Sequence, residues 1–174
     1  MKKKNNDLSV WKTSKRLERN YERILKVVQN QFFQAISNKN NANEMISMLK
    51  ILARQPSFET YCQELASKMV TSVYQKTEGN WRKAAKQNTK GHEIYEALKR
   101  EKQNVLLESA IQKLIEQNAS FIKSLPLEIA SDITKYIEKE TIKGRRAEEL
   151  AQEIKIKFPE KSKANAKCIA RTEV

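Results

Sequence analysis

Helical periodicity dominates this chain. After residue 8, apolar side chains recur at steps of three and four residues in almost every stretch, which places them on one face of an α-helix. No stretch alternates apolar and polar residues with the period of two that a half-buried strand requires. The 174 residues include only 3 glycines and 3 prolines, so few positions force a turn. We therefore predict an all-α fold, an elongated bundle of about seven to eight helices.

Polar runs, prolines and glycines divide the periodic stretches into separate helices. The first predicted helix ends in the polar run 37–41. The second spans about 42–54 and is stopped by Pro56, after which a third helix starts. Gly79 is expected to end this third helix, and the basic residues 81–86 that follow are expected to form a short turn.

The second half of the chain contains longer helical stretches. Residues 93–123 fit one long helix, or two helices with a bend between them. Pro126 is expected to open the next helix, and Gly144 to end it in the left-handed conformation that glycine adopts easily. A further amphipathic helix is predicted to close at Pro159, and Ser162 is a suitable N-cap for the last one.

Positive charge is the strongest bias in the composition. Lysine and arginine number 34 against 21 aspartates and glutamates, for a net charge of +13. A compact body with this surplus attracts polyanions, which include DNA, RNA, an acidic protein surface and an anionic membrane. Two basic clusters stand out, one in the first helix and one around Trp81. The candidate nucleic-acid contacts are Lys12, Lys15, Arg16, Arg19, Arg23, Arg82, Lys83 and Lys86.

Each basic cluster also has an ordinary structural interpretation. The first could be a solvated helix face preceded by a disordered basic leader at residues 1–7, or it could neutralise phosphates with a steep dependence on salt. In the second, Trp81 could stack on a base, although we favour packing of its ring on a neighbouring helix. An acidic protein surface would suit the same cations.

Little in the sequence indicates catalysis or metal binding. His92 is the only histidine, so a catalytic triad or a histidine-based metal site would depend on it alone. Cys62 and Cys168 lie far apart and in no metal-ligand spacing, and Cys62 falls on an apolar face, where a free thiol is usually a core residue. We therefore predict a protein that is not an enzyme and that needs neither cofactor nor metal.

No stretch approaches the ~20 apolar residues that span a membrane. The basic start of the chain has no apolar run behind it and so does not fit a secretory signal. We expect the protein to be made in a cytoplasm and to have no membrane span.

The last fifty residues follow a recognisable pattern. Pro126 opens a helix that ends at Gly144, a second amphipathic helix follows, and a Ser162-capped helix ends the chain. That last helix contains the run Ile169, Ala170, Arg171, Thr172 and Glu173. This pattern resembles the phage head morphogenesis family, also called the phage Mu F-like or minor head protein family. The run 169–173 is its specific part.

The resemblance divides the chain into regions. It covers about residues 124–174, which would be the start of the family domain, and leaves 8–123 as a separate N-terminal helical region. The family domain continues well beyond its Arg-Thr-Glu run, so we expect a longer domain of which this chain carries the first part.

What the resemblance implies is a structural role in a virion. Members of the family are present in few copies per head, associate with the portal protein and other capsid components, and in some cases contact DNA. The protein would then act in the phage head after assembly in the host cytoplasm, and Arg171, Thr172 and Glu173 would orient a partner. Two alternatives stay open: a free-standing, non-specific nucleic-acid-binding protein, and the helical carrier part of a phage-delivered toxin.

Overall fold

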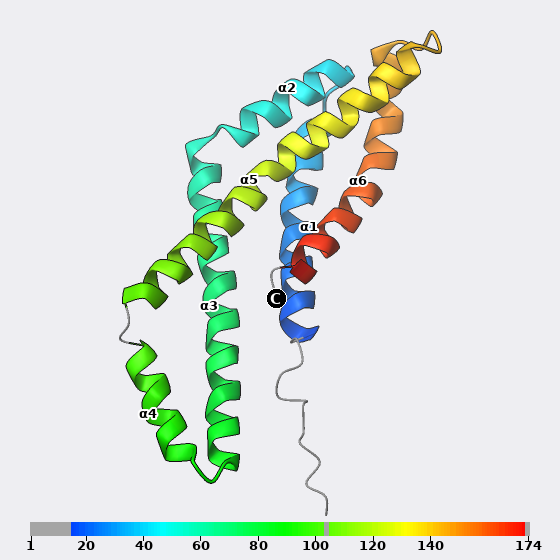
Figure 1. Cartoon of the computed structure of the whole chain (residues 1–174). Helices are drawn as coiled ribbons and strands as arrows, with labels where there is room; N and C mark the ends of the chain where they lie inside the picture. Colours follow the sequence, from blue (N-terminus) through cyan, green and yellow to red (C-terminus); the bar gives the residue numbers. More distant parts are fainter. Residues whose placement is uncertain (1–14, 103–104, 173–174) are drawn as a thin grey trace, which may run out of the picture.

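The structure is built of helices, with no strand in the part of the chain that it describes (Figure 1). This computed structural model describes residues 15–102 and 105–172. The helices are α1 (Lys15–Ser37), α2 (Ala42–Ala53), α3 (Pro56–Gln87), α4 (Gly91–Lys102), α5 (Val105–Thr141) and α6 (Ala147–Thr172). The predicted all-α class is confirmed, while the predicted number of seven to eight helices is too high for the described residues.

Five of these helices surround one core, and α4 lies outside it (Figure 1). α1 and α3 run in opposite directions, and α2 links them at the upper end of the view. α5 crosses α2 and α3, and α6 returns alongside α1. α4 packs against the C-terminal half of α3 and forms a helical hairpin with it below the core. We call α4 and residues 74–87 of α3 the α3–α4 arm.

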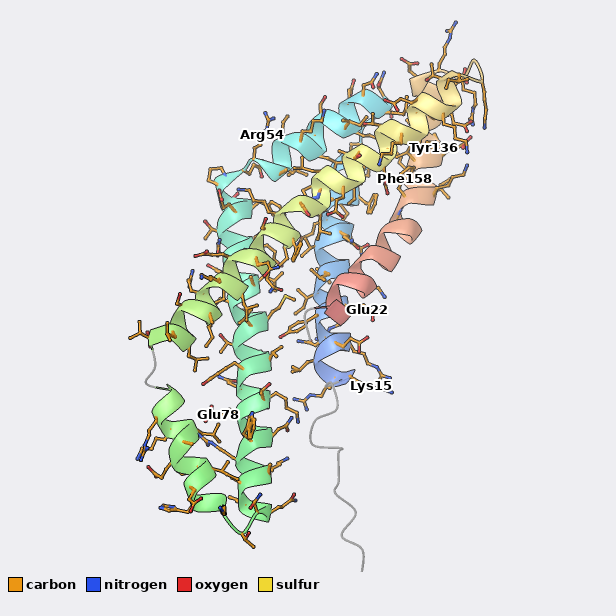
Figure 2. The ribbon with its side chains drawn as sticks, in the orientation of Figure 1. Lys15, Glu22, Arg54, Glu78, Tyr136 and Phe158 are labelled. Carbon is orange, nitrogen blue, oxygen red and sulfur yellow. The ribbon has the colours of Figure 1, made fainter. Side chains whose placement is uncertain are left out.

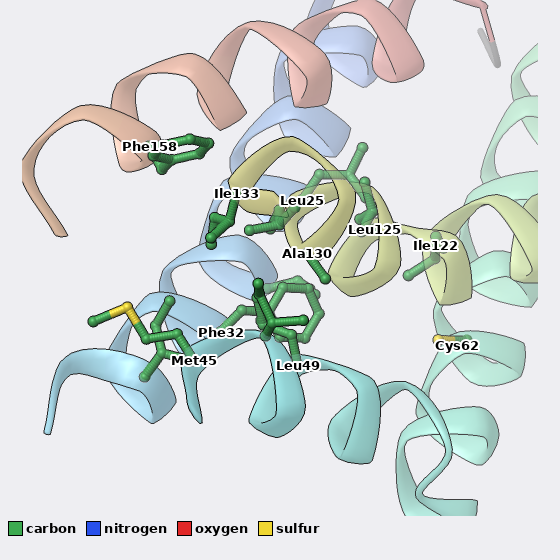
Figure 3. Close-up of a cluster of buried hydrophobic side chains, with 14 of the residues drawn as sticks. Leu25, Phe32, Met45, Leu49, Cys62, Ile122, Leu125, Ala130, Ile133 and Phe158 are labelled. Carbon is green, nitrogen blue, oxygen red and sulfur yellow. The ribbon is translucent and has the colours of Figure 1, made fainter. Parts of the chain in front are cut away.

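The core is a single apolar cluster at the crossing of the helices. Figure 3 shows its central part, where Leu25 of α1, Leu49 of α2 and Ile133 of α5 lie close together. All three side chains are fully buried. Burial of one such side chain contributes about 1.5–3 kcal/mol, so this cluster is the main source of stability. The apolar face that helical periodicity predicts for the first helix lies in the core, where its buried members are Tyr21, Leu25, Val28, Phe32 and Ile36.

Local sequence signals mark the start of α2 and the end of α5. The side-chain oxygen of Asn41 accepts a hydrogen bond from the backbone N–H of Asn43 at 2.8 Å and caps α2. Gly144 has a positive φ of 82°, as predicted for the end of α5. Its N–H donates to the carbonyl of Thr141 at 2.8 Å, and the next N–H, of Arg145, donates to that of Glu140 at 3.2 Å. This pair of bonds is the Schellman arrangement, which requires the left-handed glycine.

The predicted helix end at Gly79 is wrong. α3 continues through this glycine to Gln87, and the basic residues 81–86 are helical instead of forming a separate turn. A glycine inside a helix costs only about 0.5–1 kcal/mol relative to alanine. The backbone hydrogen bonds of the helix and the packing of α4 against this part of α3 outweigh that small penalty.

The predicted breaks at two prolines are also wrong. Pro126 lies inside α5 and Pro159 inside α6. A proline within a helix costs about 3 kcal/mol or more, because it removes one hydrogen bond and crowds the preceding turn. Leu125 and Ile129 are buried on either side of Pro126, and burial of two such side chains offsets a cost of that size. Within the predicted stretch 93–123, residues 93–102 belong to α4 and residues 105–123 to α5, so of the two alternatives the structure has two helices.

The two predicted regions contribute to the same core. Their boundary, between residues 123 and 124, falls inside the continuous helix α5. α6, from the second region, packs against α1, from the first. The predicted leader 1–7 lies outside the described residues, as does the start of the first predicted helix up to residue 14.

Candidate functional site

The outward face of α1 carries a row of positive charges. Lys15, Arg16, Arg19 and Arg23 are all exposed. Their spacing of three and four residues places them on one side of the helix. The opposite side carries the buried stripe that begins at Tyr21, so the core holds the inner face of α1 while the cations face solvent. We call these four residues the α1 basic face.

Neighbouring groups compensate this charge only in part. The guanidinium of Arg23 donates to the amide oxygen of Asn20 at 3.0 Å, and Asn20 is neutral. Farther along α1, the ammonium of Lys26 donates to the carboxylate of Glu22 at 2.6 Å. A surface pair of this kind contributes about 0.3–0.5 kcal/mol, so a phosphate can replace such a carboxylate at little cost. Lys12, also predicted to contact nucleic acid, lies outside the described residues.

The second predicted basic cluster lies on the α3–α4 arm. Arg82, Lys83 and Lys86 are exposed near the C-terminal end of α3. Arg82 forms an ion pair with Glu78, one helical turn earlier. Because the residues between 79 and 87 are helical, these three cations occupy one side of α3. They are therefore held by the helix, and the short separate turn that the sequence predicted for them is wrong.

Trp81 lies at an apolar groove of about 510 Å³ between α3, α4 and the start of α5. The groove is lined by Tyr74, Thr77, Glu78, Trp81, Ile94, Ala97, Leu98 and Leu107. Trp81 is 40% exposed, so its ring borders the neighbouring helix without being enclosed by it. The sequence favoured packing of Trp81 on a neighbouring helix over stacking on a base, and the structure places its side chain beside Ile94 and Leu98 of α4.

Antiparallel packing brings the two basic surfaces to the same end of the molecule. The hydroxyl of Tyr21 in α1 donates to the backbone carbonyl of Met69 in α3. From Met69, α3 continues downward past the N-terminal end of α1 (Figure 1). Figure 2 shows Lys15 and Glu78 in this lower part of the molecule. The two clusters are distant in the sequence, and the opposite directions of α1 and α3 place the helix segments that carry them in the same lower part of the molecule (Figure 1).

Two of the three predicted partner-binding residues lie at the end of α6. Arg171 and Thr172 belong to its last turn. Ala170, immediately before them, is fully buried in the core. Glu173 lies outside the described residues. This end of α6 is thus attached to the body of the bundle.

The histidine and the cysteine singled out earlier occupy different environments. His92 is exposed at the start of α4 and lines a hollow of about 610 Å³ with Lys86 and Tyr95 among others. Cys62 is free and buried in the core, as expected from its place on an apolar face. Burial raises the pKa of the Cys62 thiol to about 11, so the thiol stays protonated at neutral pH.

A polar cluster at the α5–α6 turn was missed by sequence reasoning. The carboxylate of Glu153 in α6 accepts hydrogen bonds from Tyr136 at 2.5 Å, from Lys157 at 2.8 Å and from Arg145. Arg145 also donates to Glu140 at 3.2 Å, so one guanidinium joins a carboxylate from each helix. Hydrogen bonds from Arg145, Lys157 and Tyr136 lower the pKa of Glu153 well below its usual range.

This cluster is continuous with the core and ties the turn between the helices in place. The ring of Tyr136 packs edge-on against Phe158 with centroids 5.6 Å apart, and the ammonium of Lys157 lies 5.4 Å from the Tyr136 centroid. Two spacings of four residues, 136 to 140 and 153 to 157, were visible in the sequence. They indicated intrahelical neighbours, but not that the Gly144 turn would bring them together.

Neither a cluster of metal-binding side chains nor a membrane-spanning helix occurs among the residues that the structure describes. Among residues 15–102 and 105–172, no group of three or more histidine, cysteine, aspartate or glutamate side chains could hold a metal ion. Of the helices described, none is long and apolar enough to cross a membrane. Comparison of this chain with protein-family models, with curated proteins and with solved structures found no match.

Proposed function

We propose that this chain is a minor head protein of a tailed phage or prophage, which binds other virion components and does not catalyse a reaction. The pattern of residues 124–174, and above all the run 169–173, supports this assignment by resemblance. α6 carries the first part of that run and is anchored in the core through Ala170. A portal protein bound at this end of α6 would be held in a fixed position relative to the whole bundle.

The observation that carries the binding role is the division of α1 into two faces. Its inner face is buried from Tyr21 to Ile36, and its outer face carries Lys15, Arg16, Arg19 and Arg23 in solvent. A row of cations on an anchored helix neutralises phosphates without reading base sequence. We therefore propose that the α1 basic face makes non-specific contact with packaged DNA.

The experiment that tests this function is capture of the portal protein. The portal encoded beside this chain would be immobilised and incubated with the chain at low and high salt, with and without DNA. Contacts made by buried apolar and hydrogen-bonded groups persist in salt, whereas DNA bridging disappears as salt rises. Salt-resistant capture without DNA is the expected result, and complete loss of capture at high salt would contradict a direct portal contact.

A free-standing nucleic-acid-binding protein is the second candidate. It is favoured by the position of both basic surfaces at one end of the molecule, which would offer DNA a cationic surface without any protein partner. In this case the chain alone binds duplex DNA tightly at low salt and does not retain the portal at any salt concentration. The same capture experiment therefore separates the two candidates.

A further inference from the structure

The groove on the α3–α4 arm is not used by the proposed contacts with DNA or the portal. Its floor is formed by Tyr74 and Trp81 from α3, Ile94 and Leu98 from α4, and Leu107 from α5. Ala97, also on its lining, is exposed, so the groove opens to solvent. A cavity of about 510 Å³ lies within the range of roughly 300–1,000 Å³ found for binding pockets.

Positively charged side chains lie next to this apolar groove, whose one charged lining residue is Glu78. A small hollow that shares Glu78 and Leu98 with the groove is also lined by Arg82 and Lys99. Arg82 in turn lines the next hollow along the arm, together with Lys86. Between residues 74 and 100 the arm has seven lysines and arginines against three glutamates. Between α3 and α4, the apolar groove is therefore followed by hollows that have lysine and arginine in their lining, and we call these cations the cationic rim.

This charge argues against two occupants from the chain itself. The segment 1–14 contains four lysines and one aspartate, so it would bring further positive charge to the rim. A second copy of the chain has a net charge of +13 and would do the same. Like charges brought together at an interface cost several kcal/mol. The occupant that complements the groove is apolar on one side and acidic on the other.

We infer that the groove binds an acidic amphipathic helix of a partner protein. Helices enter apolar grooves through side chains at positions i, i+3, i+4 and i+7, which form one stripe. Ile94, Leu98 and Leu107 offer such a stripe aliphatic contacts, whereas the phosphates of a nucleic acid would gain nothing from this floor. Carboxylates beside the stripe would reach Lys86 and Lys99, which are both exposed.

Direct binding of designed helical peptides to the full chain tests this inference. The first fluorescent probe has leucine at i, i+3, i+4 and i+7 and mainly glutamate elsewhere. The second is the same peptide with lysine in place of glutamate, and the third is a single-stranded oligo(dT). Fluorescence anisotropy at low salt measures each dissociation constant. The acidic peptide is expected to bind at least about tenfold more tightly than the lysine peptide, a difference of roughly 1.4 kcal/mol.

A pair of matched variants locates the binding surface. Ala97→Glu places a carboxylate on the groove lining at an exposed helical position, so the fold is preserved. Ala110→Glu makes the same change at an exposed position of α5 outside the lining. Ala97→Glu should weaken binding of the acidic peptide about tenfold, and Ala110→Glu should leave it unchanged. Circular dichroism checks that both variants remain helical.

Three results would overturn the inference. The first is that the acidic and the lysine peptide bind equally tightly, or that neither binds. The second is that Ala97→Glu does not change the dissociation constant of the acidic peptide. The third is that the acidic peptide does not bind, while oligo(dT) binds and loses its binding in Ala97→Glu but not in Ala110→Glu. The last result would assign the groove to nucleic acid. The outcome is independent of portal capture. A chain that binds the acidic peptide but not the portal would support the groove as a binding site and contradict the proposed contact with the portal.

Discussion

Two glycines of the α3–α4 arm differ in what surrounds their α-carbons. Gly79 lies inside α3, and a Cβ added there would meet no atom within 4 Å. Gly91 starts α4, where an added Cβ would collide with the carbonyl oxygen of Ala85. Glycine at this position lets the start of α4 lie directly against the backbone of Ala85. In this turn between α3 and α4, the backbone N–H of Gly91 donates to the carbonyl of Asn88 at 3.0 Å.

Alanine substitution should therefore have opposite effects at these two positions. Gly79→Ala removes backbone freedom from the unfolded chain without a clash, so we expect the free energy of unfolding to rise by about 0.5–1 kcal/mol. Gly91→Ala must push α4 away from Ala85, so we expect the free energy of unfolding to fall. Urea unfolding followed by circular dichroism measures both. A stabilising Gly91→Ala variant would contradict the tight turn.

Two leucines of α5 provide a second matched pair. Leu125 is 1% exposed in the core and Leu127, two residues later, is 45% exposed. Leu125→Ala leaves a cavity among packed side chains and should lower the free energy of unfolding by about 2–5 kcal/mol. Leu127→Ala should change it by less than about 1 kcal/mol, since an exposed side chain has few neighbours to lose. Similar losses of stability for both variants in urea titrations would contradict the placement of α5.

At the level of elements, the α5–α6 turn is stabilised by charge as well as by its glycine. Glu153 accepts hydrogen bonds from Arg145, Lys157 and Tyr136, and its pKa is lowered by these partners. Glu140 has a lowered pKa as well, caused first by its hydrogen bond from Lys143. A carboxylate whose pKa is lower in the folded state stabilises the fold while it is ionised, at pH values above its unfolded pKa.

This arrangement predicts a stability that falls in acid. The contribution of Glu153 should be complete above its ordinary pKa of 4.5 and decline as the pH falls below that value. The difference in unfolding free energy between wild type and Glu153→Gln should therefore be largest at neutral pH and shrink on acidification. Urea titrations from pH 7 to pH 3 measure it.

An exposed glutamate outside this cluster supplies the control for the acid titration. Glu138 is exposed on the same helix as Tyr136, and Glu138→Gln should give a smaller difference from wild type at neutral pH. A Glu153→Gln variant that behaves like Glu138→Gln across this pH range would mean that the hydrogen bonds to Glu153 do not stabilise the turn.

At the scale of the whole molecule, the lower end gathers the charge that the proposed function uses. Neutralising Lys15, Arg19 and Arg23 together, each to glutamine, should weaken binding to duplex DNA. It should also reduce the slope of log K against log salt by about 0.9 for each phosphate that the protein no longer neutralises. Fluorescence anisotropy over a salt series measures both quantities. The residues are exposed, so the fold should be unaffected.

A control with an equal change of charge elsewhere separates the α1 basic face from net charge. Lys50, Lys135 and Lys139 are exposed on α2 and the C-terminal half of α5, which lie at the upper end of the molecule (Figure 1). The triple glutamine variant of these lysines should retain most of the affinity and the salt slope. If both triple variants lowered the affinity and the salt slope equally, DNA binding would depend only on the net charge of the protein. The α1 basic face would then not be the contact surface.

Sequence alone determined the helical class, the core stripe of α1 and the glycine-closed end of α5. These features depend on residues close together in the chain, whose spacing or backbone preference acts locally. The same reasoning placed false breaks at Gly79, Pro126 and Pro159, because the propensity of one residue does not include the burial of its neighbours.

Only the tertiary structure decided which distant residues meet. The gathering of the two basic surfaces depends on antiparallel contact between α1 and α3, and the Glu153 cluster on the fold-back of α6 against α5. The groove likewise needs side chains from three helices at once. Such contacts depend on how the apolar faces of the helices pack against one another. Sequences with the same helical periodicity can pack these faces in different arrangements, so periodicity alone does not predict the contacts.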